Sequence, residues 1–186
     1  MRKVHVFDNV SIDGFFTDEK NDMSWAHTRD EEWNAFAGGN AGGDAELLFG
    51  RVTYEMMAAF WPTPQAAQML PDVAAGMNRL PKTVFSRTLT KVTWQNTTLI
   101  KGDLVSEVTR MKQQPGPDLV ILGSGTIVSQ LTQARLIDEY QIVMSPIVLG
   151  KGRTLFETVE GKVAMTLTKT RAFKNGNVVL WYEPGR

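Results

Sequence analysis

Three apolar segments of the chain each lead into a short polar segment whose residue types suit the binding of phosphate groups. These polar segments are Gly50-Arg51-Val52-Thr53, Ser86-Arg87 and Gly123-Ser124-Gly125-Thr126. Glycine lets the backbone turn tightly and lets a ligand approach it closely. A helix that starts at such a turn offers unpaired N–H groups and a partial positive charge to an anion. Phosphate binding is therefore one function that these segments predict.

Each segment also has a purely structural interpretation. Arg51 and Glu55 are spaced to form an ion pair along one helix, which would stabilise that helix by only about 0.3 kcal/mol. Ser86-Arg87 fits an ordinary polar turn, and Gly123-Ser124-Gly125 fits a turn from a strand into a helix. The glycines miss the G-x-G-x-x-G dinucleotide fingerprint, because Val128 occupies the third glycine position, and the Lys-Ser/Thr pair of a P-loop is missing as well.

Taken together, the three segments favour a ligand with several phosphates. Two helix N-termini and two arginines, Arg51 and Arg87, would converge on one edge of one sheet. A pyrophosphate across two helix ends, with an arginine left for a ribose phosphate, describes NADPH better than ATP, because no Mg²⁺-binding carboxylate accompanies the segments. The sequence therefore predicts NADPH as the cofactor.

The elements that must position these residues alternate between strands and helices. Apolar runs predict strands over residues 3–10, 45–49, 83–86, 119–122 and 139–145, and residues 92–100 could form another. Helical spacing predicts helices over residues 30–37, 51–60 and 73–79, one from an N-cap at Asp103 to about Gln113, and one after Gly125. The last of these places Ile127, Val128, Leu131 and Ala134 on one face. Residues 18–28 and 146–153 are predicted to be loops, and residues 64–70 are ambiguous.

The closing segments 164–173 and 178–182 flank Asn175-Gly176, which is a hairpin signal. Strands that alternate with helices predict an α/β fold: a mixed, mostly parallel sheet with helices on both faces and a C-terminal antiparallel hairpin. Ligands of such folds bind in the crevice beyond the carboxyl ends of the strands. The three polar segments all follow such ends.

Length and composition predict one domain over residues 1–186. The formal net charge is zero, without the basic excess of a general nucleic-acid binder or a polybasic membrane module. The chain has no cysteine, which excludes a disulfide framework and a thiol nucleophile and suits the cytoplasm. The alternating N-terminus predicts a strand and no signal peptide, and no apolar run approaches the ~20 residues of a membrane helix.

Other kinds of site find little support. Two histidines, His5 in a predicted strand and His27 in a predicted loop, do not predict a metal site without cysteine. No G-x-S-x-G motif is present for a serine hydrolase. The five tryptophans are too dispersed for a platform that stacks single-stranded nucleic acid.

Four motifs, DNVSIDGFF, LLFGRVTYE, VILGSGTIVSQL and LIDEYQIVMSPIVLGKGRTLF, resemble the dihydrofolate reductase-like superfamily. They are most similar to the group that includes the C-terminal reductase domain of the riboflavin-pathway deaminase-reductase. The resemblance spans essentially the whole chain. It implies the dihydrofolate reductase-like fold and an NADPH-dependent reductase that transfers hydride to a C=N bond. The substrate would be a small pterin-like or ribosylaminopyrimidine-like heterocycle.

The resemblance also implies roles for individual residues of the cofactor site. Gly50, Arg51 and Thr53 would hold phosphate at one helix end, and Gly123, Ser124, Gly125, Thr126 and Ile127 would do so at the other. Ser86 and Arg87 would lie at the adenosine ribose and its phosphate. Asn9 and Val10 would lie beside the nicotinamide.

On the substrate side, the stretch from Asn21 to Trp25 resembles the Met-Pro-Trp loop of dihydrofolate reductase, with Ser24 in place of the proline. Met23 and Trp25 would contact the substrate. Asp30 falls where the substrate-binding carboxylate would be, and a carboxylate there can help to deliver the proton that accompanies hydride. The structural alternative is that Asp30 only starts a helix, because Glu31 and Glu32 follow it.

Departures from the resemblance leave the substrate open. Riboflavin-pathway reductases carry a glutamate where this chain has Gly123, and the Gly-Ser-Gly triplet is closer to the three glycines of dihydrofolate reductase. The alternatives are dihydrofolate reductase-type activity, a non-catalytic NADPH-binding module of the same fold and, least favoured, a protein-interaction domain. The resemblance includes dimerisation through the sheet and the C-terminal region, and the alternating residues 178–182 permit a homodimer.

Overall fold

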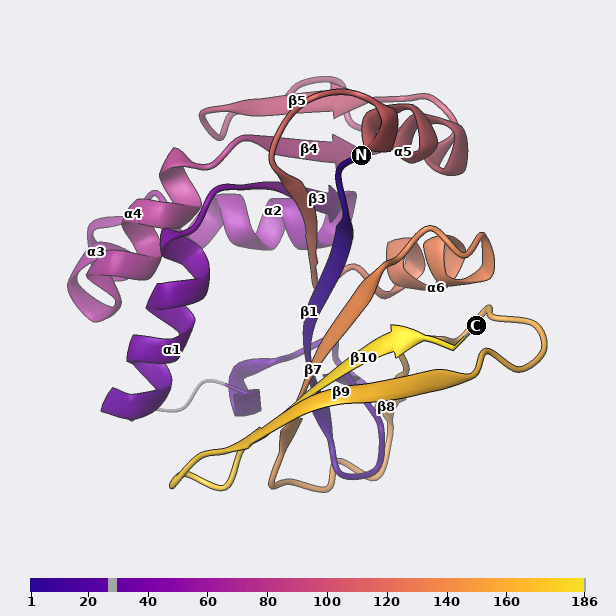
Figure 1. The fold of residues 1–186 in the computed structure, drawn as a ribbon. Helices are drawn as coiled ribbons and strands as arrows, with labels where there is room; N and C mark the ends of the chain where they lie inside the picture. The colour runs from indigo at the N-terminus through magenta and orange to yellow at the C-terminus, as the bar shows by residue number, and fades with distance from the viewer. Residues whose placement is uncertain (27–29, 186) are drawn as a thin grey trace.

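The computed structural model describes residues 1–26 and 30–185 and is built around one eight-stranded sheet (Figure 1). The strand order is β5-β4-β3-β6-β1-β7-β10-β9. The strands of this sheet are β1 (Val4–Ser11), β3 (Ala45–Gly50), β4 (Lys82–Phe85), β5 (Thr97–Ile100), β6 (Asp118–Leu122), β7 (Glu139–Ser145), β9 (Met165–Ala172) and β10 (Val178–Pro184). Neighbours from β5 to β7 are parallel, whereas β10 is antiparallel to β7 and β9. The predicted mixed, mostly parallel sheet is confirmed.

Helices cover both faces of this sheet, as predicted (Figure 1). They are α1 (Glu31–Gly42), α2 (Arg51–Phe60), α3 (Pro64–Met69), α4 (Pro71–Arg79), α5 (Leu104–Gln113) and α6 (Gly125–Gln133), with a single 3₁₀ turn at Ser24–Ala26. On one face, Val108 of α5 and Val128 of α6 pack against Val6 and Ile121. On the other face, Tyr54 of α2 packs with Phe49, and Trp33 of α1 packs with Val143. The alternation of strand side chains between these faces explains the period-two pattern of the sequence.

Three predicted boundaries were wrong or incomplete. Helix α1 continues beyond residue 37 to Gly42, and its last turn packs closely against α4: a Cβ on Gly76 of α4 would lie 2.3 Å from the carbonyl oxygen of Ala41. Only Thr97–Ile100 of the segment 92–100 forms a strand. The backbone N–H groups of Thr93 and Trp94 donate instead to the hydroxyl of Tyr54, at 3.0 and 3.1 Å. Residues 64–69 of the ambiguous segment form α3, which Thr63 caps.

The two predicted loops, residues 18–28 and 146–153, are joined by a small second sheet. In it, β2 (Thr17–Asp18) pairs with β8 (Gly152–Arg153). The carboxylate of Asp13 strengthens the connection, because it accepts the backbone N–H groups of Leu149 and Gly150 at 3.1 and 2.7 Å. The loops after β1 and β7 are therefore held together at the carboxyl edge of the sheet. His27, predicted in the first loop, lies outside the described residues.

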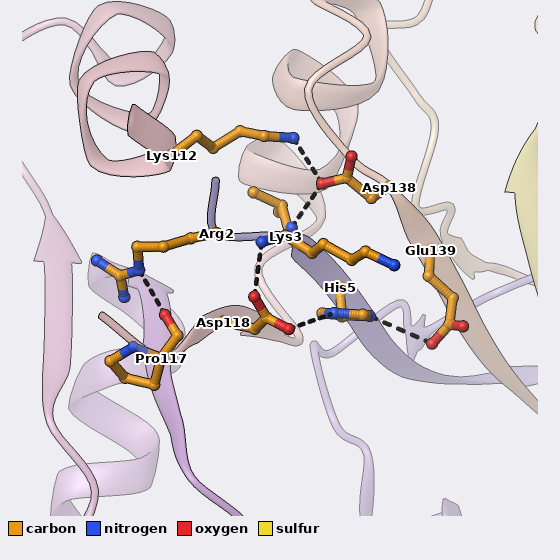
Figure 2. Close-up of polar contacts among 9 residues, drawn as sticks. Arg2, Lys3, His5, Lys112, Pro117, Asp118, Asp138 and Glu139 are labelled. Atoms are coloured by element: carbon orange, nitrogen blue, oxygen red, sulfur yellow. Dashed lines mark hydrogen bonds and ion pairs between the residues drawn. The ribbon is translucent and has the colours of Figure 1, made fainter. Parts of the chain in front are cut away.

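The opposite, amino-terminal edge of the sheet carries a cluster of charged side chains (Figure 2). The two ring nitrogens of His5 lie 3.5 Å from Asp118 and 3.2 Å from Glu139, which start the neighbouring strands. Lys112 pairs with Asp138 at 2.5 Å, and Asp138 also accepts the N–H of Val4 at 2.7 Å. These contacts tie β1 to the strands on either side and to α5. His5 therefore has a structural environment, as its place in a strand suggested.

Candidate functional site

The carboxyl ends of β3, β4 and β6 meet the first turns of α2, α5 and α6 around a cavity of about 470 Å³. Every residue of the three polar segments identified in the sequence lines this cavity, as does Ile127. The parallel pairing of these strands explains why segments so distant in sequence meet here. Their convergence on one sheet edge is what the sequence predicted. Their binding roles stay predictions.

The helices α2 and α6 begin at the cavity without a side-chain cap. Their N-cap residues, Gly50 and Ser124, make no capping hydrogen bond to the first turn, whereas Asp103 caps α5 by accepting the N–H of Ser106 at 2.9 Å. The first backbone N–H groups of an uncapped helix need a partner, and an anion can supply it. Two of the three helix starts around the cavity are thus suited to phosphate.

The glycine turn after β6 has an unusual backbone conformation. Gly123 has a φ of +59° and Ser124, which is not a glycine, a φ of +63°. A turn in which a left-handed residue, Ser124, leads directly into a helix leaves the first N–H groups of that helix available to an anion. The hydroxyl of Ser124 also accepts the backbone N–H of Gly50 at 2.9 Å. That bond joins the start of α6 to the start of α2.

The two arginines of the polar segments line the cavity, as phosphate binding requires, and their surroundings also fit the structural interpretation. Arg51 lines the cavity and also pairs with Glu55 at 2.8 Å, with both side chains about half exposed. Such exposed pairs contribute about 0–1 kcal/mol, so the pair does not prevent Arg51 from contacting a ligand. Ser86 accepts the N–H groups of Thr88 and Leu89, which confirms a polar turn, while Arg87 remains exposed in the cavity wall.

The wall of the cavity that lies opposite the polar segments, called here the far wall, is formed by Phe16, Thr17 and Arg153. Sequence reasoning missed these residues. Phe16 packs on Gly125, where an added Cβ would lie 2.7 Å from the ring. Thr17 is 6% exposed, and its hydroxyl oxygen has no hydrogen-bond partner within the described part of the chain. Arg153 lies 5.9 Å from the Phe16 ring centroid and 3.4 Å from Glu157. Only the pairing of β2 with β8, which local sequence patterns do not encode, brings Thr17 and Arg153 together.

Four residues assigned by resemblance lie outside the wall of this cavity, whereas Met23 lines it. Val10 is buried in the core beneath α5 and α6, and Asn9 points to the other face of β1. Trp25 donates its ring N–H to the backbone oxygen of Asp22 at 3.1 Å. Asp30 caps α1, because its carboxylate accepts the N–H of Trp33 at 2.8 Å. The structural alternative for Asp30 is therefore realised, and its catalytic role stays a prediction.

The described residues include no group of three or more histidine, aspartate or glutamate side chains placed to hold a metal ion. In the same residues, none of the helices has the length and apolar character needed to cross a membrane.

The fold agrees with the comparisons to known proteins. The family model of the RibD C-terminal domain matches residues 2–179, so the chain belongs to this family, whose members include NADPH-dependent reductases. Among curated relatives, the uncharacterized protein YyaP of Bacillus subtilis (strain 168) is 25% identical over 174 residues, which cover 93% of this chain and 90% of YyaP.

Two solved structures show the same fold. A putative riboflavin biosynthesis protein from Shewanella sp. PV-4 matches with a TM-score of 0.74 and 23% identity over 99% of both chains. Dihydrofolate reductase from Enterococcus faecalis, complexed with NADP(H), matches with a TM-score of 0.62 and 14% identity over 99% of this chain and 97% of that enzyme. The dihydrofolate reductase-like fold expected from the motifs is thereby confirmed.

Proposed function

We propose that the protein is an NADPH-dependent reductase that transfers hydride to a C=N bond of a pterin-like or ribosylaminopyrimidine-like heterocycle, as 5-amino-6-(5-phosphoribosylamino)uracil reductases do. The observation that carries the proposal is the arrangement of two uncapped helix starts, at Gly50 and Ser124, with Arg51 and Arg87 around one cavity. Membership of the RibD C-terminal domain family supports it.

The residues present fit a dinucleotide with a phosphorylated ribose. The backbone N–H groups that start α2 and α6 would hold the pyrophosphate, since both helix ends lack a side-chain cap. Arg51 would hold a phosphate at the start of α2, and Ser86 and Arg87 would hold the adenosine ribose and its phosphate. A cavity of about 470 Å³ falls within the range of small-molecule sites, about 300–1,000 Å³.

When bound, NADPH supplies the hydride. The chain's own residues would orient the reactants and supply the proton. Phe16 and Met23 give the cavity wall apolar surface against which the heterocycle would pack. Asp30, held at the start of α1, would hold a proton at a ring nitrogen of the heterocycle. A carboxylate can accept several hydrogen bonds, so the capping bond to Trp33 is compatible with this role.

Dihydrofolate reductase-type activity is the second candidate, and Gly123 favours it. The φ of +59° and the 3.2 Å between an added Cβ and Thr53 Cγ2 disfavour the glutamate of riboflavin-pathway reductases at this position. A non-catalytic NADPH-binding module is the third candidate. The capping role of Asp30 favours it, because the carboxylate then has a reason to be present without catalysis.

The test is oxidation of NADPH by the purified protein in the presence of dihydrofolate, other pterins and ribosylaminopyrimidines. We expect turnover with one of these classes, and a fall in kcat in Asp30→Asn with NADPH affinity unchanged. Asparagine caps helices as well as aspartate does, so this variant keeps α1 intact. NADPH binding without turnover on any heterocycle would contradict the reductase proposal and support the non-catalytic module.

A further inference from the structure

Asp8 is a buried carboxyl group for which the proposed reaction has no use. It is 1% exposed and lies on β1 between Val6 and Val10, on the face that packs against α5 and α6. Its carboxyl accepts a hydrogen bond from the backbone N–H of Gly123. Among the described residues, its Oδ2 atom is buried and finds no hydrogen-bond partner. A charged residue in an otherwise apolar strand pattern was the sequence signal that could have identified it.

The surroundings of Asp8 are mostly apolar. Its register neighbour on β7 is Ile142, and the apolar residues Ile127 of α6 and Phe16 belong to the same core. The titratable group of β7 on this face is Tyr140, whose hydroxyl bonds to Thr132. The charged residues that line the cavity, on the ligand side of the glycine turn, are Arg51, Arg87, Asp103 and Arg153.

Burial in this environment raises the pKa of the Asp8 carboxyl well above 3.8, and the hydrogen bond from Gly123 opposes the rise only in part. Asp8 can therefore relieve its desolvation by binding a proton, since its carboxyl forms no ion pair within the described chain. The proton would come from solvent and form an O–H bond on Oδ2, with no other bond made or broken.

Gly123 connects this carboxyl to the ligand site. Its N–H donates to Asp8 behind the turn, and the same residue lines the cavity in front of it. A carboxylate behind the turn and a phosphate in front of it would repel each other across a poorly solvated stretch of protein, whereas a protonated carboxyl would not.

We propose that Asp8 is a proton-linked positioning residue: phosphate groups bind at the Gly123-Ser124-Gly125 turn with uptake of one proton by the Asp8 carboxyl. The inference rests on the proposed function, because it requires that this turn hold a pyrophosphate. It adds a property that the proposed function lacks, namely an affinity for the dinucleotide that decreases as the pH rises.

The first test is calorimetric titration with ADP-ribose, which has the pyrophosphate and lacks a 2′-phosphate that would itself titrate. Between about pH 5 and pH 9, we expect the wild-type affinity to fall at least about tenfold, which corresponds to a shift of one pKa unit. The affinity of Asp8→Asn should stay nearly constant, because the amide keeps an acceptor for the Gly123 N–H and carries no charge. Asp118→Asn, at the amino-terminal edge shown in Figure 2, is the matched control and should behave as wild type.

Parallel pH profiles for wild type and Asp8→Asn, with binding intact, would overturn this inference and leave the cofactor proposal standing. Lack of binding at every pH would overturn both. A second readout needs no variant: ¹³C NMR titration of the Asp8 carboxyl with and without ADP-ribose. We expect the ligand to raise the pKa of Asp8 by about one unit or more, and an unchanged pKa in the saturated complex would overturn the inference.

Discussion

The hydroxyl of Ser124 accepts the backbone N–H of Gly50 at 2.9 Å, although 74 positions separate the two residues in the sequence. This bond fixes the start of α6 relative to the start of α2 at the carboxyl edge of the sheet. The two helix ends that we assign to the pyrophosphate are therefore held in place before any ligand binds. Such preorganisation lowers the entropy cost of binding.

Two substitutions of Ser124 distinguish the contribution of its hydrogen bond to stability from the contribution of its backbone strain. Ser124→Ala removes the acceptor of Gly50 while keeping a side chain at a φ of +63°. We expect the free energy of unfolding to fall by about 1–2 kcal/mol and the affinity for NADPH to fall with it. Ser124→Gly loses the same bond but relieves a left-handed strain of about 1 kcal/mol, so it should be more stable than Ser124→Ala. Urea unfolding measures both differences, and equal stability of the two variants would contradict this account.

Gly125 is predicted to tolerate no side chain, because Phe16 occupies the space that a Cβ would need. An added Cβ would lie 2.7 Å from the ring. Gly125→Ala should therefore destabilise the protein by about 1–3 kcal/mol and displace Phe16 from the cavity wall. The matched control is Gly39→Ala in α1, where no atom lies within 4 Å of the added Cβ. That change should raise stability by up to about 1 kcal/mol in thermal unfolding, and similar losses in both variants would contradict the packing argument.

The contribution of Lys82 to the free energy of unfolding should increase as the pH rises into the alkaline range. Its ammonium group donates to the carbonyl oxygens of Met77 and Leu80 at 2.8 and 2.6 Å and lies 4.4 Å from the Trp94 ring centroid. Burial nevertheless lowers the pKa of Lys82 from 10.5 to about 8. Between these two values the unfolded chain binds more protons than the folded one, so the free energy of unfolding contributed by Lys82 rises with pH.

The measurement is urea unfolding of wild type and Lys82→Met at several pH values between about 7.5 and 10.5. The methionine variant provides the control, because other groups that titrate in this range are common to both proteins. We expect the stability of wild type relative to Lys82→Met to increase across this range. A constant or decreasing difference would show that the carbonyl groups of Met77 and Leu80 and the Trp94 ring outweigh the effect of burial.

Local sequence patterns were sufficient to predict those helices and strands whose two ends are marked by turn or helix-breaking residues. Residues 51–60 were predicted as a helix and form α2, since Gly50 precedes it and Trp61-Pro62 follows it. The end of α1 could not be predicted, because Gly38 and Gly39 disfavour a helix and the last turn packs closely against α4 at Gly76, a contact that the sequence of α1 does not contain.

The convergence of the polar segments was predictable because parallel strands end at one edge of a sheet. The far wall of the cavity was not predictable. Thr17 and Arg153 meet through the pairing of β2 with β8, and Asp8 meets Gly123 because β1 lies beside β6. Such contacts depend on the order of strands in the sheet, which periodicity and turn residues do not specify. The capping role of Asp30 was open in the sequence and is visible only in the structure.

The most direct test of the central claim is fluorescence titration with NADPH and NADH of wild type, Arg51→Ala and Arg110→Ala. Arg110 is the matched control, because it is an exposed helical arginine that pairs with a glutamate, Glu107, and lies outside the cavity wall. We predict that wild type and Arg110→Ala bind NADPH alike. Arg51→Ala should bind NADPH at least about tenfold more weakly, equivalent to about 1.4 kcal/mol, with a smaller loss for NADH. Absence of NADPH binding in wild type, or equal affinity in all three proteins, would contradict the assignment of this cavity to the cofactor.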